Sequence, residues 1–240
     1  MKILQPFYIL YIITVFVTSM LIIVPITLFF SIFNANKIIF DIVKYWSKYW
    51  LFMIGMPVQK IGSVPLNGKY VYVANHISYL DSMVLFSAID SYFRVLGNKE
   101  FSRKFIIGLI YRQIVVMVDR SSQESRKNSF KVLSQYVKDG NSIFIFPEGK
   151  FNTTENILVN FYDGAFKIAV DTNTDIVPIV LPDTAKRWHY SAWWKILPGK
   201  NRVIVMSPVN PIGLTVEELK QKVYSIIETE LKKYDYNNIH

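Results

Sequence analysis

One histidine in this sequence stands among polar residues that could perform acid–base chemistry. His76 lies in the segment Asn75-His76-Ile77-Ser78-Tyr79-Leu80-Asp81, where a carboxylate follows the imidazole five positions later. An imidazole with an ordinary pKa of about 6.5 can take a proton from a hydroxyl group at neutral pH. A carboxylate partner fixes the imidazole tautomer and stabilises the imidazolium. The pair therefore suits a general base that activates a hydroxyl group.

The five-residue spacing restricts where this pair can lie. On a regular helix, positions five apart point roughly 140° away from each other, because each residue turns about 100°. His76 and Asp81 can therefore meet only if His76 lies in a loop and Asp81 in the first turn of the following helix. A simpler interpretation fits the same residues: Ser78 and Asp81 form a capping box of the S-x-x-D type, and His76 is an ordinary loop residue.

Two further polar segments follow predicted strands. One is Asp119-Arg120, and the other is Pro147-Glu148-Gly149. Beside the helix start at Ser121–Ser122, the guanidinium of Arg120 and free backbone amides could bind a phosphate. The alternatives are a solvated arginine paired with Asp119, and an ordinary turn in which Glu148 faces water.

The elements that must position these residues are typical of an α/β domain with a mostly parallel sheet flanked by helices. Strands are predicted at Tyr70–Ala74, Arg94–Gly97, Ile114–Val118, Ser142–Phe146, Ile176–Leu181 and, near the sheet edge, Arg202–Met206. Helices are predicted at Ser122–Asp139, closed by Gly140, at Asp163–Asp171, and after a capping box of Thr215 and Glu218. Open sheets bind ligands outside the carboxyl ends of their strands, so the three polar segments should converge there.

The N-terminal part of the chain is apolar enough to be embedded in a membrane. Phe7–Phe33 carries no charge and exceeds the roughly 20 apolar residues that cross a bilayer. Pro25 is expected to kink this helix or end it early. A secretory signal has a shorter apolar core of roughly 7–15 residues, and a buried core helix is seldom so uniformly apolar. A second apolar patch, Tyr49–Val58, is predicted to be interfacial or re-entrant.

Charge and composition narrow the class of protein further. The net charge of +9 favours a polyanionic partner, and the apolar N-terminus favours an anionic bilayer over nucleic acid. By the positive-inside rule, Lys37, Lys44 and Lys48 place the residues after the first segment on the cytoplasmic side. The lack of cysteine excludes thiolate catalysis, disulfides and cysteine metal sites. No carboxylate cluster has metal-ligand spacing, so no metal is expected.

The length of 240 residues supports one catalytic domain, predicted at 61–240, after membrane-anchoring helices at 1–60. Within that domain, the segment 187–195 interleaves tryptophans with cations, as proteins do at bilayer interfaces. A segment that packs at the edge of the core would have the same composition.

Taken together, the polar segments resemble a known family. The segment Asn75–Asp81 matches the form NHxSxxD, and Phe146-Pro147-Glu148-Gly149 matches FPEG. With Val118-Asp119-Arg120 and Val177-Pro178-Ile179-Val180 they resemble, in order, the four motifs of the glycerolipid acyltransferases related to 1-acyl-glycerol-3-phosphate acyltransferase. The resemblance covers roughly residues 60–185.

The resemblance implies transfer of a fatty acyl chain from acyl-CoA or acyl carrier protein to the free hydroxyl of 1-acyl-glycerol-3-phosphate, giving phosphatidic acid. It implies His76 as general base with Asp81 as its partner, no acyl-enzyme, and no cofactor besides the thioester co-substrate. The implied partners are membrane lipids and a lysophospholipid, and the protein would be membrane-bound. Acceptor-binding roles are implied for Asn75, Ser78, Arg120, Glu148, Gly149 and Lys150.

Two positions depart from the family pattern. After Gly149 the family usually has threonine or serine and then often arginine, whereas this chain has Lys150 and Phe151. A lysine that is common between the first two motifs is replaced by Asn98. A rearranged phosphate pocket would favour another lysophospholipid or amphiphile. Two other classes stay open: a non-catalytic lipid-binding module, and a membrane-anchored hydrolase with Ser78 as nucleophile, although the G-x-S-x-G elbow is missing.

Overall fold

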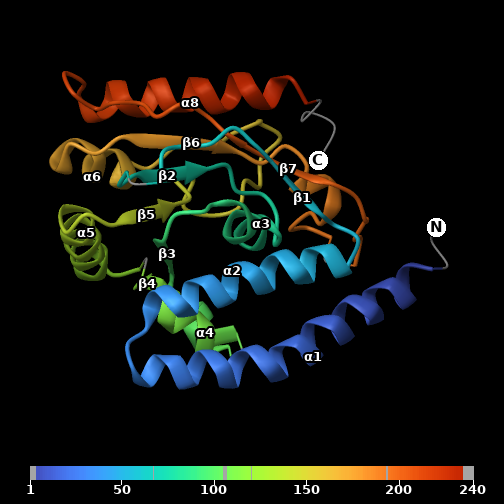
Figure 1. The fold of residues 1–240 in the computed structure, drawn as a ribbon. Helices are drawn as coiled ribbons and strands as arrows, with labels where there is room; N and C mark the ends of the chain where they lie inside the picture. Colours follow the sequence, from blue (N-terminus) through green and yellow to red (C-terminus); the bar gives the residue numbers. More distant parts are fainter. Residues whose placement is uncertain (1–3, 67, 105–106, 120, 193, 235–240) are drawn as a thin grey trace.

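A mostly parallel sheet forms the centre of the protein in a computed structural model, which describes residues 4–66, 68–104, 107–119, 121–192 and 194–234 (Figure 1). The strands are β1 (Val58–Ile61), β2 (Val71–Ala74), β3 (Phe93–Asn98), β4 (Val115–Val118), β5 (Ser142–Ile145), β6 (Ile176–Val180) and β7 (Asn201–Val205). Their order in the sheet is β1-β7-β6-β2-β5-β3-β4. Neighbouring strands are parallel except for β6 and β7. The predicted α/β fold is confirmed.

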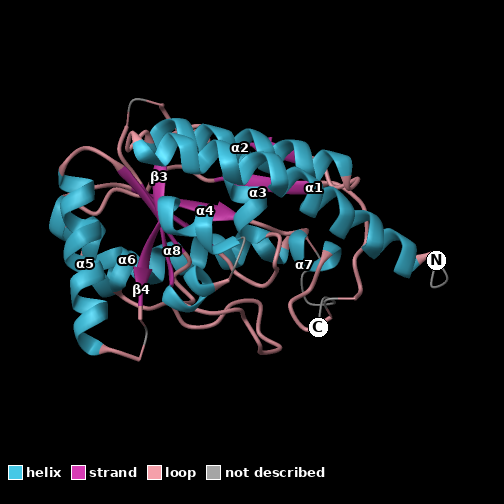
Figure 2. Ribbon diagram, turned by 90° about the horizontal axis from the view of Figure 1, so that it is seen from below, coloured by secondary structure: helices cyan, strands magenta, loops and turns pink. Residues whose placement is uncertain are grey.

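Helices cover both faces of this sheet (Figure 2). They are α1 (Gln5–Ile32), α2 (Asn36–Met53), α3 (Asp81–Ala88), η1 (Lys99–Arg103), α4 (Ile107–Ile114), α5 (Gln123–Lys138), α6 (Gly164–Thr172), α7 (Thr184–Arg187) and α8 (Val216–Lys232). One core lies between the sheet and helices α1 to α4, and a second lies under α5, α6 and α8. Both faces of the central strands are therefore buried, which explains their continuous apolar runs.

The predicted caps form where the sequence places them. Ser122 accepts a hydrogen bond from Ser125 N at the start of α5. Thr215 and Glu218 form both bonds of the capping box that starts α8. Gly140 follows α5 with φ of +89°, a conformation that glycine adopts without steric cost. Local hydrogen bonding therefore sets the ends of these two helices.

Of the two alternatives for Pro25, an early end of the first helix is wrong, because α1 continues to Ile32, and the kink stays a prediction. Proline removes one backbone donor, but Thr27 and Phe30 after it still pack on the protein. Thr27 is fully buried and donates its hydroxyl to Val24 O. Tertiary packing thus offsets the lost backbone bond.

The second apolar patch is not re-entrant, since Tyr49–Met53 is the last part of α2 and Val58 begins β1. Trp50 and Leu51 are buried while Tyr49 and Phe52 are exposed, so this end of α2 has a core face and an open apolar face. The interfacial interpretation therefore stays a prediction for the exposed face. The division of the chain at residue 60 also stays a prediction, and β1 crosses that position.

Candidate active site

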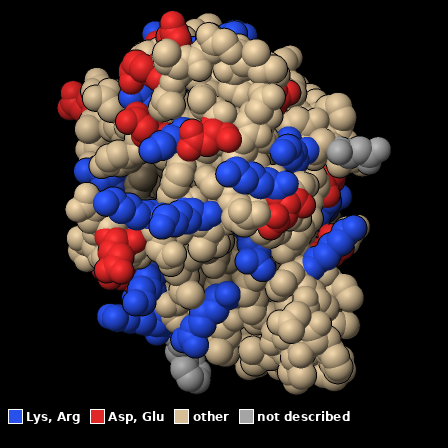
Figure 3. Space-filling model, turned by 90° about the vertical axis from the view of Figure 1, so that its left-hand side faces the viewer, with Lys and Arg blue, Asp and Glu red and all other residues tan. Residues whose placement is uncertain are grey.

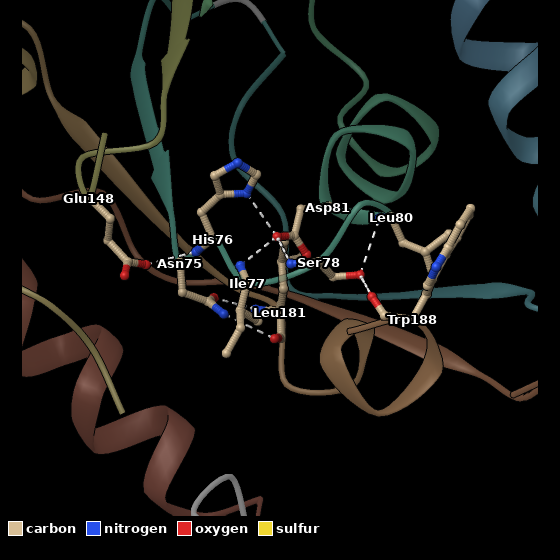
Figure 4. A network of polar contacts seen from close by, with 9 residues as sticks. All are labelled: Asn75, His76, Ile77, Ser78, Leu80, Asp81, Glu148, Leu181 and Trp188. Carbon is tan, nitrogen blue, oxygen red and sulfur yellow. Dashed lines mark hydrogen bonds and ion pairs between the residues drawn. The ribbon is translucent and has the colours of Figure 1, made fainter. Parts of the chain in front are cut away.

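The predicted base and its carboxylate lie directly after the central strand β2. The chain leaves the sheet at Ala74, turns, and enters α3 at Asp81. His76 Nδ1 lies 2.9 Å from Asp81 Oδ2 (Figure 4). The second ring nitrogen of His76 points away from this network (Figure 4). The structure therefore places His76 in a loop and Asp81 in the first helical turn, as the spacing predicts.

Asp81 holds the whole turn as well as the imidazole. Its Oδ2 also accepts hydrogen bonds from the backbone N–H groups of Ile77 and Ser78, both at 2.8 Å. The Ser78 hydroxyl accepts from Leu80 N rather than from Asp81 N, so only half of the capping box forms. The same oxygen, Asp81 Oδ2, thus accepts the capping bond from Ser78 N and contacts the His76 imidazole, so the two interpretations are compatible. Asp81 is fully buried, which keeps its interaction with the imidazole poorly screened.

Asn75 fixes the start of this loop. Its side-chain Nδ2 donates to Leu181 O at 3.1 Å, and its side-chain Oδ1 accepts from Leu181 N at 2.8 Å. Leu181 directly follows β6, the neighbour of β2 in the sheet. This pair of bonds joins the ends of two adjacent strands and so positions the loop that carries His76.

Glu148 joins the third motif to the same loop. Because β5 is the other neighbour of β2, Glu148 reaches the backbone of His76, and its Oε1 accepts from His76 N at 2.7 Å. Its Oε2 accepts from Val159 N at a longer 3.5 Å. Glu148 is only 2% exposed, and this burial raises its pKa to about 8, although both backbone bonds act to lower the pKa. The alternative of a glutamate that faces water is therefore wrong.

Gly149 is required by the turn that follows. Its φ is +70°, and a Cβ at this position would lie 2.7 Å from a ring carbon of Tyr162. Lys150 is exposed, and Phe151 turns back so that its ring centroid is 4.4 Å from that of His76. Phe146 stacks on the same imidazole at 3.8 Å. The aromatic rings of Phe146 and Phe151 thus contact the imidazole of His76.

The hydroxyl of Ser78 is committed to the backbone. It donates to Trp188 O at 2.5 Å, and the serine is fully buried. A nucleophilic serine needs its hydroxyl within reach of the base and the substrate. This geometry therefore supports a structural role for Ser78.

Replacing Ser78 by alanine is expected to lower the free energy of unfolding by about 1–3 kcal/mol, because the part-buried Trp188 carbonyl loses the hydroxyl of Ser78 as a donor. Urea unfolding in detergent would measure this, with the exposed Ser63→Ala as the control. If Ser78→Ala abolished activity while stability stayed at the wild-type value, the structural role would be excluded.

The second motif lies further from the centre of the sheet. It follows the edge strand β4, which β3 separates from β5. Arg120 lies outside the described residues, so its predicted phosphate contact stays a prediction. Asp119 accepts hydrogen bonds from the backbone N–H and the hydroxyl of Ser121. The structure thus brings together the motifs that follow β2 and β5.

Several residues of the site have no clear signal in the sequence. Asn152 is buried and donates its backbone N–H to His76 O at 2.9 Å. The backbone of Val159 binds Glu148. Trp188 and Tyr190 belong to the aromatic segment 187–195. The sequence shows the composition of this segment but not its contact with the loop that carries His76. The packing interpretation of that segment is therefore correct for these two residues, and the interfacial one stays a prediction for the remainder.

These observations define an α/β protein with a histidine–aspartate pair at the carboxyl end of its central strand. The family model for Acyltransferase matches residues 56–182. The chain therefore belongs to the Acyltransferase family.

Known relatives agree with this assignment. The chain is 30% identical over 186 residues to a chloroplastic 1-acyl-sn-glycerol-3-phosphate acyltransferase of Brassica napus, covering 76% of this chain and 54% of that one. It is 24% identical over 172 residues to the 1-acyl-sn-glycerol-3-phosphate acyltransferase of Haemophilus influenzae, covering 70% of each. The crystal structure of PlsC, a 1-acyl-sn-glycerophosphate (LPA) acyltransferase from Thermotoga maritima, matches 97% of this chain and 96% of its own, with a TM-score of 0.83 at 20% identity. This match shows the same fold. The chain spans about half the length of the plant relatives with which it aligns.

Proposed function

We propose that this protein transfers a fatty acyl chain from a thioester, acyl-CoA or acyl carrier protein, to the free hydroxyl of 1-acyl-glycerol-3-phosphate, giving phosphatidic acid. The single observation that best supports the proposal is the His76–Asp81 pair, 2.9 Å apart at the carboxyl edge of the sheet. The names of the relatives from Brassica napus and Haemophilus influenzae support the same acceptor.

In the proposed reaction, His76 moves one proton from the acceptor hydroxyl to the leaving thiolate. His76 Nε2 takes the proton of the acceptor hydroxyl as its oxygen attacks the thioester carbonyl carbon. Asp81 holds Nδ1 and stabilises the imidazolium that forms. When the carbon–sulfur bond breaks, the leaving thiolate receives the proton from the imidazolium. The products are the new ester and a free thiol, with no acyl-enzyme.

A different lysophospholipid is the second candidate acceptor. It is favoured by Phe151, which lies against His76 where the family often has arginine. An exposed Lys150 supplies a charge but lacks the bidentate geometry of a guanidinium. The serine hydrolase is disfavoured, since the Ser78 hydroxyl donates to a backbone carbonyl.

Acyl transfer to a panel of acceptors tests this proposal. Membranes that contain the protein would be incubated with labelled acyl-CoA or acyl carrier protein thioester and with lysophosphatidic acid, lysophosphatidylcholine or lysophosphatidylethanolamine. Labelled phosphatidic acid as the main product would support the proposed acceptor. A different main product would favour the second candidate, and no transfer by the folded protein would reject both.

We further propose that α1 lies in one leaflet of a membrane, with the active site facing the cytoplasm. By length and composition, α1 could cross a bilayer. It packs along α2, however, and Ile12, Met20 and Thr27 are buried at intervals over its length (Figure 1). Since α2 is part of the catalytic core, a helix parallel to the membrane surface keeps that core outside the hydrocarbon.

The charge of the surface is compatible with such a location. Lysine and arginine side chains outnumber acidic ones on the face that carries α5 (Figure 3). The exposed cations of α5 are Arg126, Lys127, Lys131 and Lys138. Where such a basic surface faces anionic lipids, it adds electrostatic attraction to them.

Placing two lysines on the open face of α1 is expected to weaken membrane binding by at least about tenfold, because burial of a leucine or isoleucine contributes roughly 1.5–3 kcal/mol. Leu21 and Ile22 are 67% and 63% exposed in the protein. Co-sedimentation of the Leu21→Lys/Ile22→Lys variant with anionic vesicles measures the effect. Ile212→Lys, at an equally exposed position outside α1, is the matched control. Equal binding by all three proteins would contradict the proposal.

A further inference from the structure

A group of aromatic side chains, here called the aromatic wall, borders the imidazole of His76. It consists of Tyr79, Phe151, Trp188 and Tyr190. Phe151 lies 4.4 Å from the His76 ring, Tyr190 stacks on Phe151 at 5.7 Å, and Tyr79 contacts Phe151 edge-on at 5.3 Å. Trp188 continues the group from Tyr79 at 5.6 Å. An unbroken series of ring contacts therefore leads away from the proposed base.

The aromatic wall is open enough to meet a ligand. Tyr79 is 47% exposed, and the other three rings are half-buried. Rings that only filled the core would be buried, as Tyr72 and Phe144 are in the sheet. Apolar surface that stays accessible beside a reactive group favours a substrate with an apolar part.

The aromatic wall is attached to the catalytic loop rather than to a separate loop. Ser78 donates its hydroxyl to Trp188 O at 2.5 Å (Figure 4). Tyr190 N donates to Ile77 O at 3.4 Å. These bonds hold two of the four rings at a set position relative to His76. A ligand on the rings would therefore be oriented with respect to the base.

The same segment also reaches the apolar helix α1. Gln5, in the first turn of α1, donates its side-chain amide to Ile196 O at 2.7 Å and to Trp194 O at 3.3 Å. Trp188 pairs with Ile196 in an antiparallel bridge. The aromatic wall thus lies between His76 and the end of the helix that we place in the membrane.

We propose that the aromatic wall binds the ester and first methylenes of the acyl chain that the acceptor already carries. On this assignment, which rests on the proposed function, the protein selects a long single-chain lysolipid over a short-chain analogue. Phe151, where the family often has arginine, contributes apolar contact instead of a charge. The remaining length of the chain stays in the membrane beside α1.

The test compares a long-chain with an acetyl 1-acyl-glycerol-3-phosphate, which keeps the ester but has no methylenes, as acceptors of the full-length protein. The ring of Tyr190 contacts Phe151 and not His76, so its removal leaves the proposed base in place. In Tyr190→Leu, the ratio of kcat/KM for the long acceptor to kcat/KM for the short acceptor is expected to fall about fivefold. This is the effect of losing one aromatic contact. The change should lie in KM for the long acceptor. Phe151→Leu should behave alike, while Phe151→Tyr, which keeps a ring, should retain the ratio. Phe130→Leu, at a half-buried phenylalanine of α5, is the matched control.

An unchanged ratio in both leucine variants would overturn the assignment while leaving acyl transfer intact. Binding of unreactive 2-deoxy analogues, measured by titration calorimetry, separates this failure from failure of the proposed function. If the wild type transferred to neither acceptor, the proposed function would fail. The assignment would still be supported if Tyr190→Leu bound the long analogue more weakly than the wild type does and bound the short analogue equally well. Equal binding of the long analogue by the variant and the wild type would overturn it.

Discussion

Replacing His76 by alanine is expected to lower kcat for acyl transfer by about 10²–10⁴-fold, the usual contribution of a general base. The alanine variant has no group that can take the proton of the acceptor hydroxyl. KM for the acceptor should change much less, since the imidazole acts on the reacting proton rather than on the bulk of the lipid. Initial rates with labelled thioester at saturating acceptor measure the effect.

A second variant separates the loss of the base from the loss of the ring. His76 stacks on Phe146 at 3.8 Å, so alanine also removes packing. His76→Gln keeps a side chain of similar length but cannot act as a base near neutral pH, and it should lose as much activity as alanine. Urea unfolding of both variants would show whether they stay folded. Transfer by either folded variant within tenfold of the wild type would exclude His76 as the base.

The central strands could be predicted because they are buried on both faces. In β2, β5 and β6 every residue is buried, and the sequence shows short apolar runs bounded by polar residues. The edge strand β1 was not predicted. Its residues Gln59, Lys60 and Ile61 are exposed, and its apolar positions continue the apolar patch before it. Helix α4 escaped because Ile114 passes directly into β4 without a glycine or proline between them.

The order of the strands could not be predicted from the sequence, because each pairing joins residues far apart in the chain. β2 pairs with β5 and β6, which lie about 70 and 105 positions later. This order decides which polar segments meet. The motifs after β2 and β5 come together, whereas the motif after β4 lies at the edge.

In the candidate active site, too, contacts between residues close in sequence could be predicted and contacts between distant residues could not. The His76–Asp81 contact followed from a spacing of five residues, because one turn joins them. The contact of Glu148 with His76 N depends on the sheet order and on the direction of the turn after β5. The partner of the Ser78 hydroxyl, Trp188 O, lies 110 positions away. Because these partners are backbone groups, which every residue has, the residue types in the sequence do not reveal them.

Glu148 leads to a prediction about stability rather than rate. Burial raises its pKa to about 8 from 4.5, so the folded protein holds this proton more tightly than the unfolded chain. For an acid of this kind, the stabilising contribution is complete below about pH 4.5 and is lost as the pH rises through about 8. The two pKa values correspond to a loss on the order of 5 kcal/mol across this range. Replacing Glu148 by glutamine is expected to remove that pH dependence.

The hydrogen bonds of Glu148 explain why glutamine is the right substitute. Oε1 lies 2.7 Å from His76 N, whereas Oε2 lies 3.5 Å from Val159 N. A neutral carboxyl would use its carbonyl oxygen for the short bond and its hydroxyl oxygen for the long contact. Glutamine places a carbonyl oxygen at the short bond and gives up only the long contact. Glu148→Ala, by contrast, leaves the His76 N–H without its acceptor and should cost about 1–3 kcal/mol at every pH.

Urea unfolding in detergent from pH 5 to pH 9 measures these effects. Glu148→Gln should match the wild type near pH 5 and exceed its stability near pH 9, while the exposed Glu155→Gln should follow the wild-type curve throughout. The family resemblance assigns Glu148 to binding of the acceptor phosphate, and that role predicts a different outcome. In that case Glu148→Gln would raise KM for the acceptor and leave the pH dependence of stability unchanged. Since Glu148 is buried and its Oε1 already accepts from His76 N, we expect the first outcome.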